Sequence, residues 1–171
     1  AQISPVLGIE ALDLNGDAWI DLVISGNIYG AEDDVVRYDA GKGLVMYGVG
    51  DGQFQPLTMP ESGFITQFDT RGLVSVRNPG SKSTPLVLIS AVNSREAMTY
   101  LPMVQGLSVQ KVNPMKVTSA LFTVGGGQRR TEVYCGSGYR SQTSCHMIIP
   151  PGATSMTTYL GSKKTSTTAV T

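Results

Sequence analysis

Short apolar or alternating runs recur along the chain, and residues typical of turns separate them. The run at residues 22–24 is continuously apolar, as expected for a strand that is covered on both faces. Asp51 and Gly52 lie between two extended runs and predict a tight hairpin, because such turns need positive φ. We therefore expect an antiparallel meander of strands at residues 6–12, 22–25, 43–47 and 53–57.

A second group of the same kind follows the first. The spacing between the similar apolar runs at residues 20–24 and 85–89 is about one propeller blade plus an insertion. The strands expected in this second group are residues 63–68, 73–77, 85–92 and 98–101.

From about residue 104 the pattern becomes that of a separate, small antiparallel sheet. Its expected strands are residues 117–124, 129–134, 145–149 and 155–160, and the Ser/Thr-rich residues 163–171 are expected to pair or fray at an edge. The pattern therefore predicts an all-β chain with one unit at residues 1–103 and another at residues 104–171.

Composition agrees with this prediction. The 171 residues include 20 Gly and 9 Pro, while only 15% are charged, which is typical of many turns between short strands. No apolar stretch approaches the ~20 residues that span a bilayer as a helix. His146 is the single histidine, which argues against most hydrolase triads and against histidine-rich zinc sites.

The net charge of zero conceals an asymmetry between the two parts of the chain. Residues 1–70 have a net charge of −9 and residues 71–171 a net charge of +9. Either the two parts neutralise each other in one folded body, or the first binds cations and the second faces an anionic partner. Nucleic acid is an unexpected partner, because the basic residues are scattered and lack interleaved aromatic side chains.

Residues 13–21 carry the most informative motif. Side-chain oxygens at loop positions one, three, five and nine can converge on a cation, position seven can add its carbonyl oxygen, and Gly16 permits a sharp turn. Oxygen donors of this kind suit Ca²⁺, and the alternative is an ordinary Asp/Asn/Gly turn. The expected calcium ligands are Asp13, Asn15, Asp17, Trp19 through its carbonyl, and Asp21.

The loop is not an EF-hand loop. Counted from Asp13, position six is Ala18 where an EF-hand loop has Gly, and position twelve is Ile24 where it has Glu. The segments on both sides of the loop are predicted to be strands instead of helices. The metal is therefore expected to pin two strands together, which is a structural role.

These residues support a resemblance to a known family. Residues 13–21 followed by the apolar run 22–24, with residues 50–54 downstream, resemble an FG-GAP/VCBS repeat of integrin-like β-propellers. Residues 26–41 also resemble surface VCBS proteins of Gram-negative bacteria. Residues 136–144 and 149–152 are similar to the ASPIC/UnbV module that ends such proteins.

The resemblance implies the C-terminal blades of a β-propeller, followed by a small antiparallel β-sandwich-like module. It also implies the calcium ligands given above, whereas residues 69–72 lack the acids for a second site. Two blades cannot close a propeller. The expected partners are therefore the remaining blades of a longer protein or another protein.

Two further groups are candidates for structure or binding. Cys135 and Cys145 form either a disulfide or a free or metal-binding pair, and no Cys-x-x-Cys spacing supports zinc. Adjacent strand residues point to opposite faces, so Cys145 and His146 are not expected to form a catalytic pair.

Aromatic residues that could stack on a sugar, or simply pack, are Trp19, Tyr29, Tyr38 and Tyr139.

Together these features predict a non-enzymatic, calcium-stabilised binding or assembly protein, located extracellularly or on the outer-membrane surface. The alternative is a glycan-binding subunit of an outer-membrane nutrient-uptake complex, with Tyr29 and Tyr38 near the ligand. An enzyme is the least supported class, because no nucleophile or acid/base pair stands in register with a partner.

Overall fold

The first sheet is a four-stranded antiparallel meander, as the sequence predicts. A computed structural model describes residues 4–30, 36–82, 84–102, 107–136 and 142–170. Asp51 and Gly52 both have positive φ (52° and 72°), which confirms the predicted hairpin. The strands, in their order across the sheet, are β1 (Gly8–Leu12), β2 (Asp21–Ser25), β3 (Leu44–Gly50) and β4 (Gln53–Pro56).

The second sheet lacks the first strand that the sequence predicts for it. The strand expected at residues 63–68 is wrong: a short helix, α1 (Met59–Ser62), precedes this segment, and Gly63 ends it with φ 62°. The Glu61 carboxylate accepts a hydrogen bond from Thr58 N at 2.7 Å, which favours a helical turn here. The observed strands are β5 (Thr70–Arg77), β6 (Leu86–Val92) and β7 (Met98–Tyr100).

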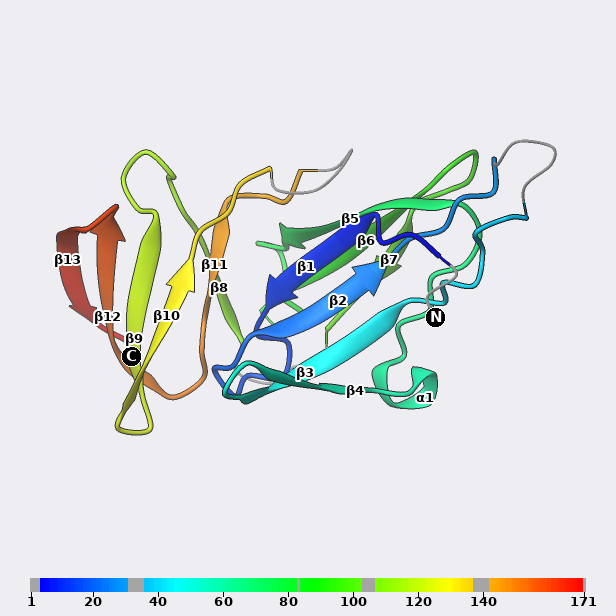
Figure 1. Ribbon diagram of the computed structural model, residues 1–171. Coiled ribbons are helices and arrows are strands. Elements are labelled where there is room, and N and C mark those ends of the chain that lie inside the picture. The colour runs from blue at the N-terminus through cyan, green and yellow to red at the C-terminus, as the bar shows by residue number, and fades with distance from the viewer. Residues whose placement is uncertain (1–3, 31–35, 83, 103–106, 137–141, 171) are drawn as a thin grey trace.

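These two sheets pack face to face, with β1 and β2 against β5 (Figure 1). Side chains at alternate positions point between them, including Val23 and Leu73, which are fully buried. The approach is closest at Gly8, where a Cβ atom would lie 2.6 Å from Leu73 Cβ. Only a glycine permits this distance without displacing a strand.

The C-terminal part forms two further sheets. Strands β8 (Ser108–Lys111) and β11 (His146–Ile149) pair with each other, and the sequence analysis missed β8, whose only buried side chain is Val109. Val109 and Ile148 belong to the core of the first two sheets, whereas Phe122 centres a second core. The last sheet has the order β10 (Gly127–Glu132), β9 (Ser119–Val124), β12 (Ala153–Leu160) and β13 (Lys163–Ala169).

The described part of the chain is therefore all-β, with four antiparallel sheets arranged as two neighbouring bodies (Figure 1). Residues 163–169 pair at an edge, in agreement with the expectation for the Ser/Thr-rich tail. The helix α1 has four residues, and nothing in the described ranges could span a bilayer as a helix.

Replacing Gly8 by Ala should lower the free energy of unfolding by about 1–3 kcal/mol, because the added methyl group overpacks the contact with Leu73. Gly30→Ala is the matched control, since no atom of the described residues lies within 4 Å of its Cβ position, and it should change stability by less than about 0.5 kcal/mol. Urea unfolding of both variants measures the difference. Equal stabilities would show that the two sheets do not pack this closely.

Candidate functional site

Asp13 shapes the start of the loop that connects β1 to β2. Its side chain is buried, and its two oxygens accept hydrogen bonds from Gly16 N at 2.7 Å and Ala18 N at 2.9 Å. Gly16 and Ala18 both have left-handed φ, 82° and 69°. The loop therefore turns back on the Asp13 carboxylate, and Ala18 adopts this conformation although it has a Cβ.

Asp21 ties the other end of the loop to the sheet. It is fully buried, and its carboxylate accepts hydrogen bonds from Leu14 N at 2.7 Å and from Gly48 N of β3 at 2.8 Å. Burial, together with the nearby charges of Asp17 and Asp13, raises the pKa of Asp21 to about 6. One carboxylate thus connects the loop, β2 and β3.

The other two side chains predicted as ligands, those of Asn15 and Asp17, lie on the more exposed side of the loop. Asn15 Nδ2 donates to Asp17 Oδ2 at 2.9 Å, and Asp17 Oδ1 accepts a hydrogen bond from Trp19 N at 2.8 Å. The side-chain oxygens therefore face the loop's own N–H groups. Among the described residues, no three Asp, Glu, His or Cys side chains are arranged to hold a metal ion.

The donor set still fits a hard divalent cation in its chemistry. It provides three carboxylates and an amide oxygen within nine residues, and the charges of Asp13 and Asp17 act to raise the pKa of Asp21. A cation among these oxygens would relieve that repulsion, provided that the carboxylates exchange some N–H hydrogen bonds for the metal. Calcium binding stays a prediction, with the same expected residues.

The Trp19 ring packs against other parts of the protein, which is one of the two alternatives that the sequence leaves open. The Arg129 guanidinium of β10 lies 3.8 Å from the ring centre, and a Cβ atom at Gly50 would lie 3.3 Å from the indole. The ring thus connects the loop to β3 and to the C-terminal sheet. No sequence spacing could indicate this contact, because Arg129 is distant in the chain.

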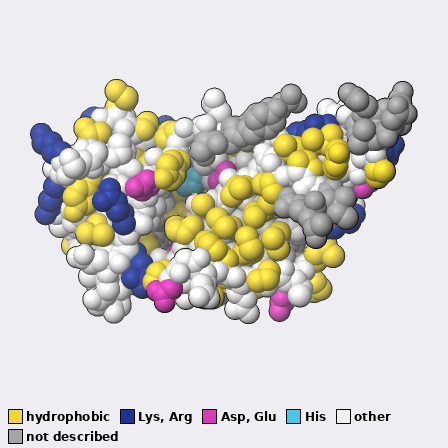
Figure 2. Space-filling model, viewed as in Figure 1, with side chains coloured by type: hydrophobic (Ala, Val, Ile, Leu, Met, Phe, Trp, Pro, Cys, Tyr) yellow, Lys and Arg dark blue, Asp and Glu magenta, His cyan; other side chains and the backbone are white. Residues whose placement is uncertain are grey.

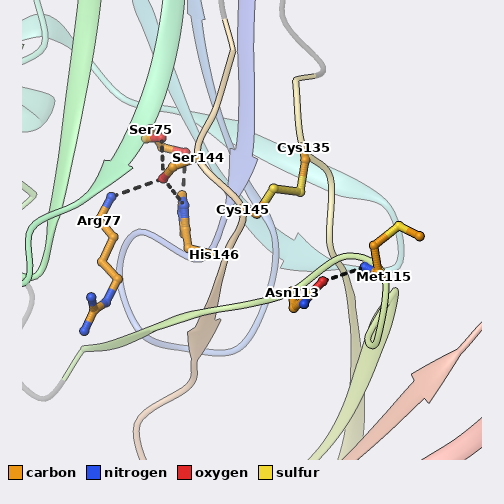
Figure 3. Close-up of a disulfide and its surroundings, with 8 residues drawn as sticks. All are labelled: Ser75, Arg77, Asn113, Met115, Cys135, Ser144, Cys145 and His146. Atoms are coloured by element: carbon orange, nitrogen blue, oxygen red, sulfur yellow. Dashed lines mark hydrogen bonds between the residues drawn. A yellow bond between two sulfur atoms is a disulfide. The ribbon is translucent and has the colours of Figure 1, made fainter.

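Cys135 and Cys145 form the predicted disulfide, with their Cα atoms 4.9 Å apart (Figure 3). Cys145 is therefore unavailable as a nucleophile next to His146. The bond joins the segment after β10 to the segment before β11. It holds Ser144 near β5, where Ser144 N donates to Ser75 O at 3.2 Å.

A buried polar cluster lies next to the disulfide, and sequence reasoning missed its central residue, Glu10. Ser75 Oγ donates to the Glu10 carboxylate at 2.6 Å, and Thr143 Oγ1 donates to its other oxygen. His146 Nδ1 lies 2.9 Å from Ser144 Oγ, and its Nε2 lies 3.5 Å from Ser75 Oγ (Figure 3). An available signal was that Glu10 occupies an inward position of β1, between Gly8 and Leu12.

The two tyrosines proposed to contact a sugar lie in neighbouring segments. Ile28 and Tyr38 form an isolated antiparallel bridge, and Tyr38 is 43% exposed. The Arg37 guanidinium lies 5.6 Å from the centre of the Tyr29 ring, so a cation already occupies a position over it. Tyr139 lies outside the described residues.

Comparison with protein-family models, curated proteins and solved structures finds no match. The resemblance to FG-GAP/VCBS repeats and to an ASPIC/UnbV module therefore depends on the motifs alone. It stays a prediction.

The Asp21 carboxyl should titrate near pH 6 in the metal-free protein, as measured by ¹³C NMR of aspartate-labelled protein. Because its folded-state pKa exceeds the unfolded value, Asp21 by itself makes the unfolding free energy fall as pH rises from about 4 to about 6. Asp69 is the control. Although burial acts to raise its pKa, hydrogen bonds from Arg71 and Asn93 hold it below the ordinary value. An Asp21 midpoint equal to or below that of Asp69 would contradict the buried position.

Proposed function

We propose that this protein is a non-enzymatic, calcium-stabilised binding and assembly protein whose first two sheets are propeller-type blades. In this proposal, each of these sheets packs against a further β-sheet, which belongs to the same polypeptide or to a partner. The observation that carries the proposal is the apolar character of the outward faces of the two packed sheets.

The outward face of the first sheet is apolar across three strands. Cross-strand partners on this face include Ile9 with Ile24, and Ile24 with Leu44. Figure 2 shows the same region as a hydrophobic surface over β1, β2 and β3. The residues of this outer face are Ile9, Ala11, Leu22, Ile24, Leu44 and Met46, all of them partly or largely exposed.

The second sheet repeats this feature on the opposite side of the stack. Its inward positions, such as Leu73 and Leu88, belong to the shared core. Its outward positions include two cross-strand apolar pairs. These pairs are Val74 with Ile89 and Val76 with Val87, all half-buried.

An antiparallel sheet at the surface usually has one apolar face toward the core and one polar face toward water. Here both sheets carry apolar side chains on the outward face as well as in the shared core, which is the pattern of an inner layer in a longer stack of sheets. Large apolar patches on a protein surface mark interaction sites. Further sheets of the same kind would cover these faces with matching side-chain spacing.

Calcium would stabilise the first of these sheets at one end. The loop with Asp13 and Asp17 joins β1 to β2, and Asp21 reaches Gly48 of β3, so an ion there would fix three strands together. The disulfide supports an extracellular or cell-surface location, because disulfides persist in oxidising compartments, where millimolar calcium sites are also found.

Glycan binding in an outer-membrane uptake complex is the second proposal. It would use the segments around Tyr29 and Tyr38, of which Tyr38 is the more accessible. A glycan array separates the two proposals, because the assembly function requires no sugar. Binding that is lost in Tyr38→Ala would favour the glycan function.

Calcium should stabilise the wild-type protein by about 2.7 kcal/mol when its concentration is 100 times the dissociation constant. Asp17→Ala should abolish this gain, because Asp17 is exposed and contributes a predicted ligand. Asp39→Ala is the matched control, since Asp39 is also exposed and lies outside the loop. Melting curves with millimolar calcium or with a chelator measure the effect. Identical wild-type curves would show that the loop is only a turn.

A photo-crosslinking residue, benzoylphenylalanine, placed at Leu44 should capture a strand-forming polypeptide segment when the protein is made in its own cells. Leu44 is 36% exposed and lies on the outer face of the first sheet. The same residue at Met115, which is 81% exposed in a turn of the C-terminal part, is the control. Mass spectrometry identifies the adducts. Equal crosslinking at both positions, or adducts with sugar or lipid alone, would contradict the assembly function.

A further inference from the structure

A cavity of about 480 Å³ lies at the junction between the first sheet and the C-terminal part. Strand β1 and the predicted metal loop line one side, and β10 and β11 line the other. The face shown in Figure 2 is hollowed between these two bodies. Its volume is within the range of small-molecule sites, which often form where two bodies of a protein meet.

Glu10 is a buried carboxylate that lines the cavity, together with the polar side chains of Ser75 and Thr143. Glu10 is only 5% exposed, and hydroxyl groups of Ser75 and Thr143 donate one hydrogen bond to each of its oxygens. The backbone of Ser75 also donates to this carboxylate, which can accept about four hydrogen bonds, so capacity for one further donor remains. The hydroxyl groups fix the orientation of the carboxylate.

The walls of the cavity are mainly apolar. Ile9 and Ile20 contribute exposed side chains from the first sheet and its loop, while Met147 and Ile148 contribute buried ones from β11. Tyr134 is 63% exposed, lines the cavity, and donates its hydroxyl hydrogen to Glu132. An aromatic ring and a carboxylate thus occur together on the β10 side, an arrangement that favours cations.

The charges that line the cavity are predominantly negative. Glu10, Asp13 and Glu132 contribute carboxylates. Among the lining residues that the structure describes, Arg130 is the only lysine or arginine, and it already donates to Ser119 Oγ at 3.0 Å and lies 4.0 Å from Glu132. Burial lowers the pKa of His146, which favours its neutral form.

We propose that the cavity binds an organic cation, an ammonium or guanidinium group on an apolar chain or ring. The charged end lies on the Glu10 carboxylate and the apolar part lies against Ile9 and Ile20. A cation offsets the desolvation of the buried carboxylate, whereas an anion would meet three carboxylates. The source is either a free amine or a lysine or arginine side chain of a polypeptide, since both present the same chemistry.

Isothermal titration at pH 7.5 tests the proposal with 2-phenylethylamine, which pairs an ammonium group with an apolar ring. It should bind at least about tenfold more tightly than 2-phenylethanol, its neutral counterpart, because one charge-assisted hydrogen bond contributes this difference. Glu10→Gln should remove the preference for the amine, whereas Glu96→Gln, an exposed control, should keep it. Equal binding of amine and alcohol, or no binding of the amine, would overturn the proposal.

If Glu10→Gln does not fold by circular dichroism, Glu132→Gln replaces it, because the Glu132 side chain is 51% exposed and tolerates substitution. This variant should weaken amine binding by about three- to tenfold, and unchanged affinity would overturn the proposal. Amide shifts of Ala11 and Thr131, both at the cavity, should accompany binding. Shifts confined to other residues would also overturn it.

A blocked lysine, Nα-acetyl-lysine amide, distinguishes the two sources. Binding of both probes supports a polypeptide side chain, and binding of phenylethylamine alone supports a free amine. The cavity shares Asp13 with the predicted metal loop, and Ile9 and Ala11 with the outer face of the first sheet, whereas Glu10 belongs to neither. The amine titration is therefore performed in saturating calcium and again in chelator. The two proposals are then tested separately, because amine binding tests the cavity and stabilisation by calcium tests the assembly function.

Discussion

The close approach of β1 to β5 is the contact on which most of this structure depends. Gly8 allows the backbone of β1 to reach Leu73, and the same two strands bring Glu10 to Ser75 at 2.6 Å. The contact therefore builds the shared core and also positions the buried carboxylate at the junction. Because the inward faces of both sheets are buried in this contact, their apolar outward faces point toward the surroundings.

Much of the fold could be predicted because local patterns agree with it. Alternating runs and the Asp51-Gly52 turn identified the first meander, whose strand order the structure confirms. The expected strand at residues 63–68 was wrong, since the helical turn at Met59–Ser62 comes first and the following chain packs without forming a strand. Strand β8 was missed because Val109 is its only buried side chain, so it shows no apolar run.

The candidate sites were predictable to different degrees. The disulfide followed from two cysteines around a short connector, and the structure confirms it. The loop at residues 13–21 was visible because all its donors are close in sequence. Glu10, Ser75 and Thr143 could not be grouped in this way, since they come from three segments that only the folded chain brings together. Long-range polar clusters of this kind have no periodic signature.

The stacking of Arg129 on Trp19 has a practical consequence. The chain contains one tryptophan, and its ring contacts the loop, β3 and the C-terminal sheet at once. Intrinsic fluorescence of the protein therefore comes from an indole at the seam between the two bodies, next to a guanidinium. Its emission wavelength and its accessibility to quenchers report whether these bodies stay docked, without any attached dye.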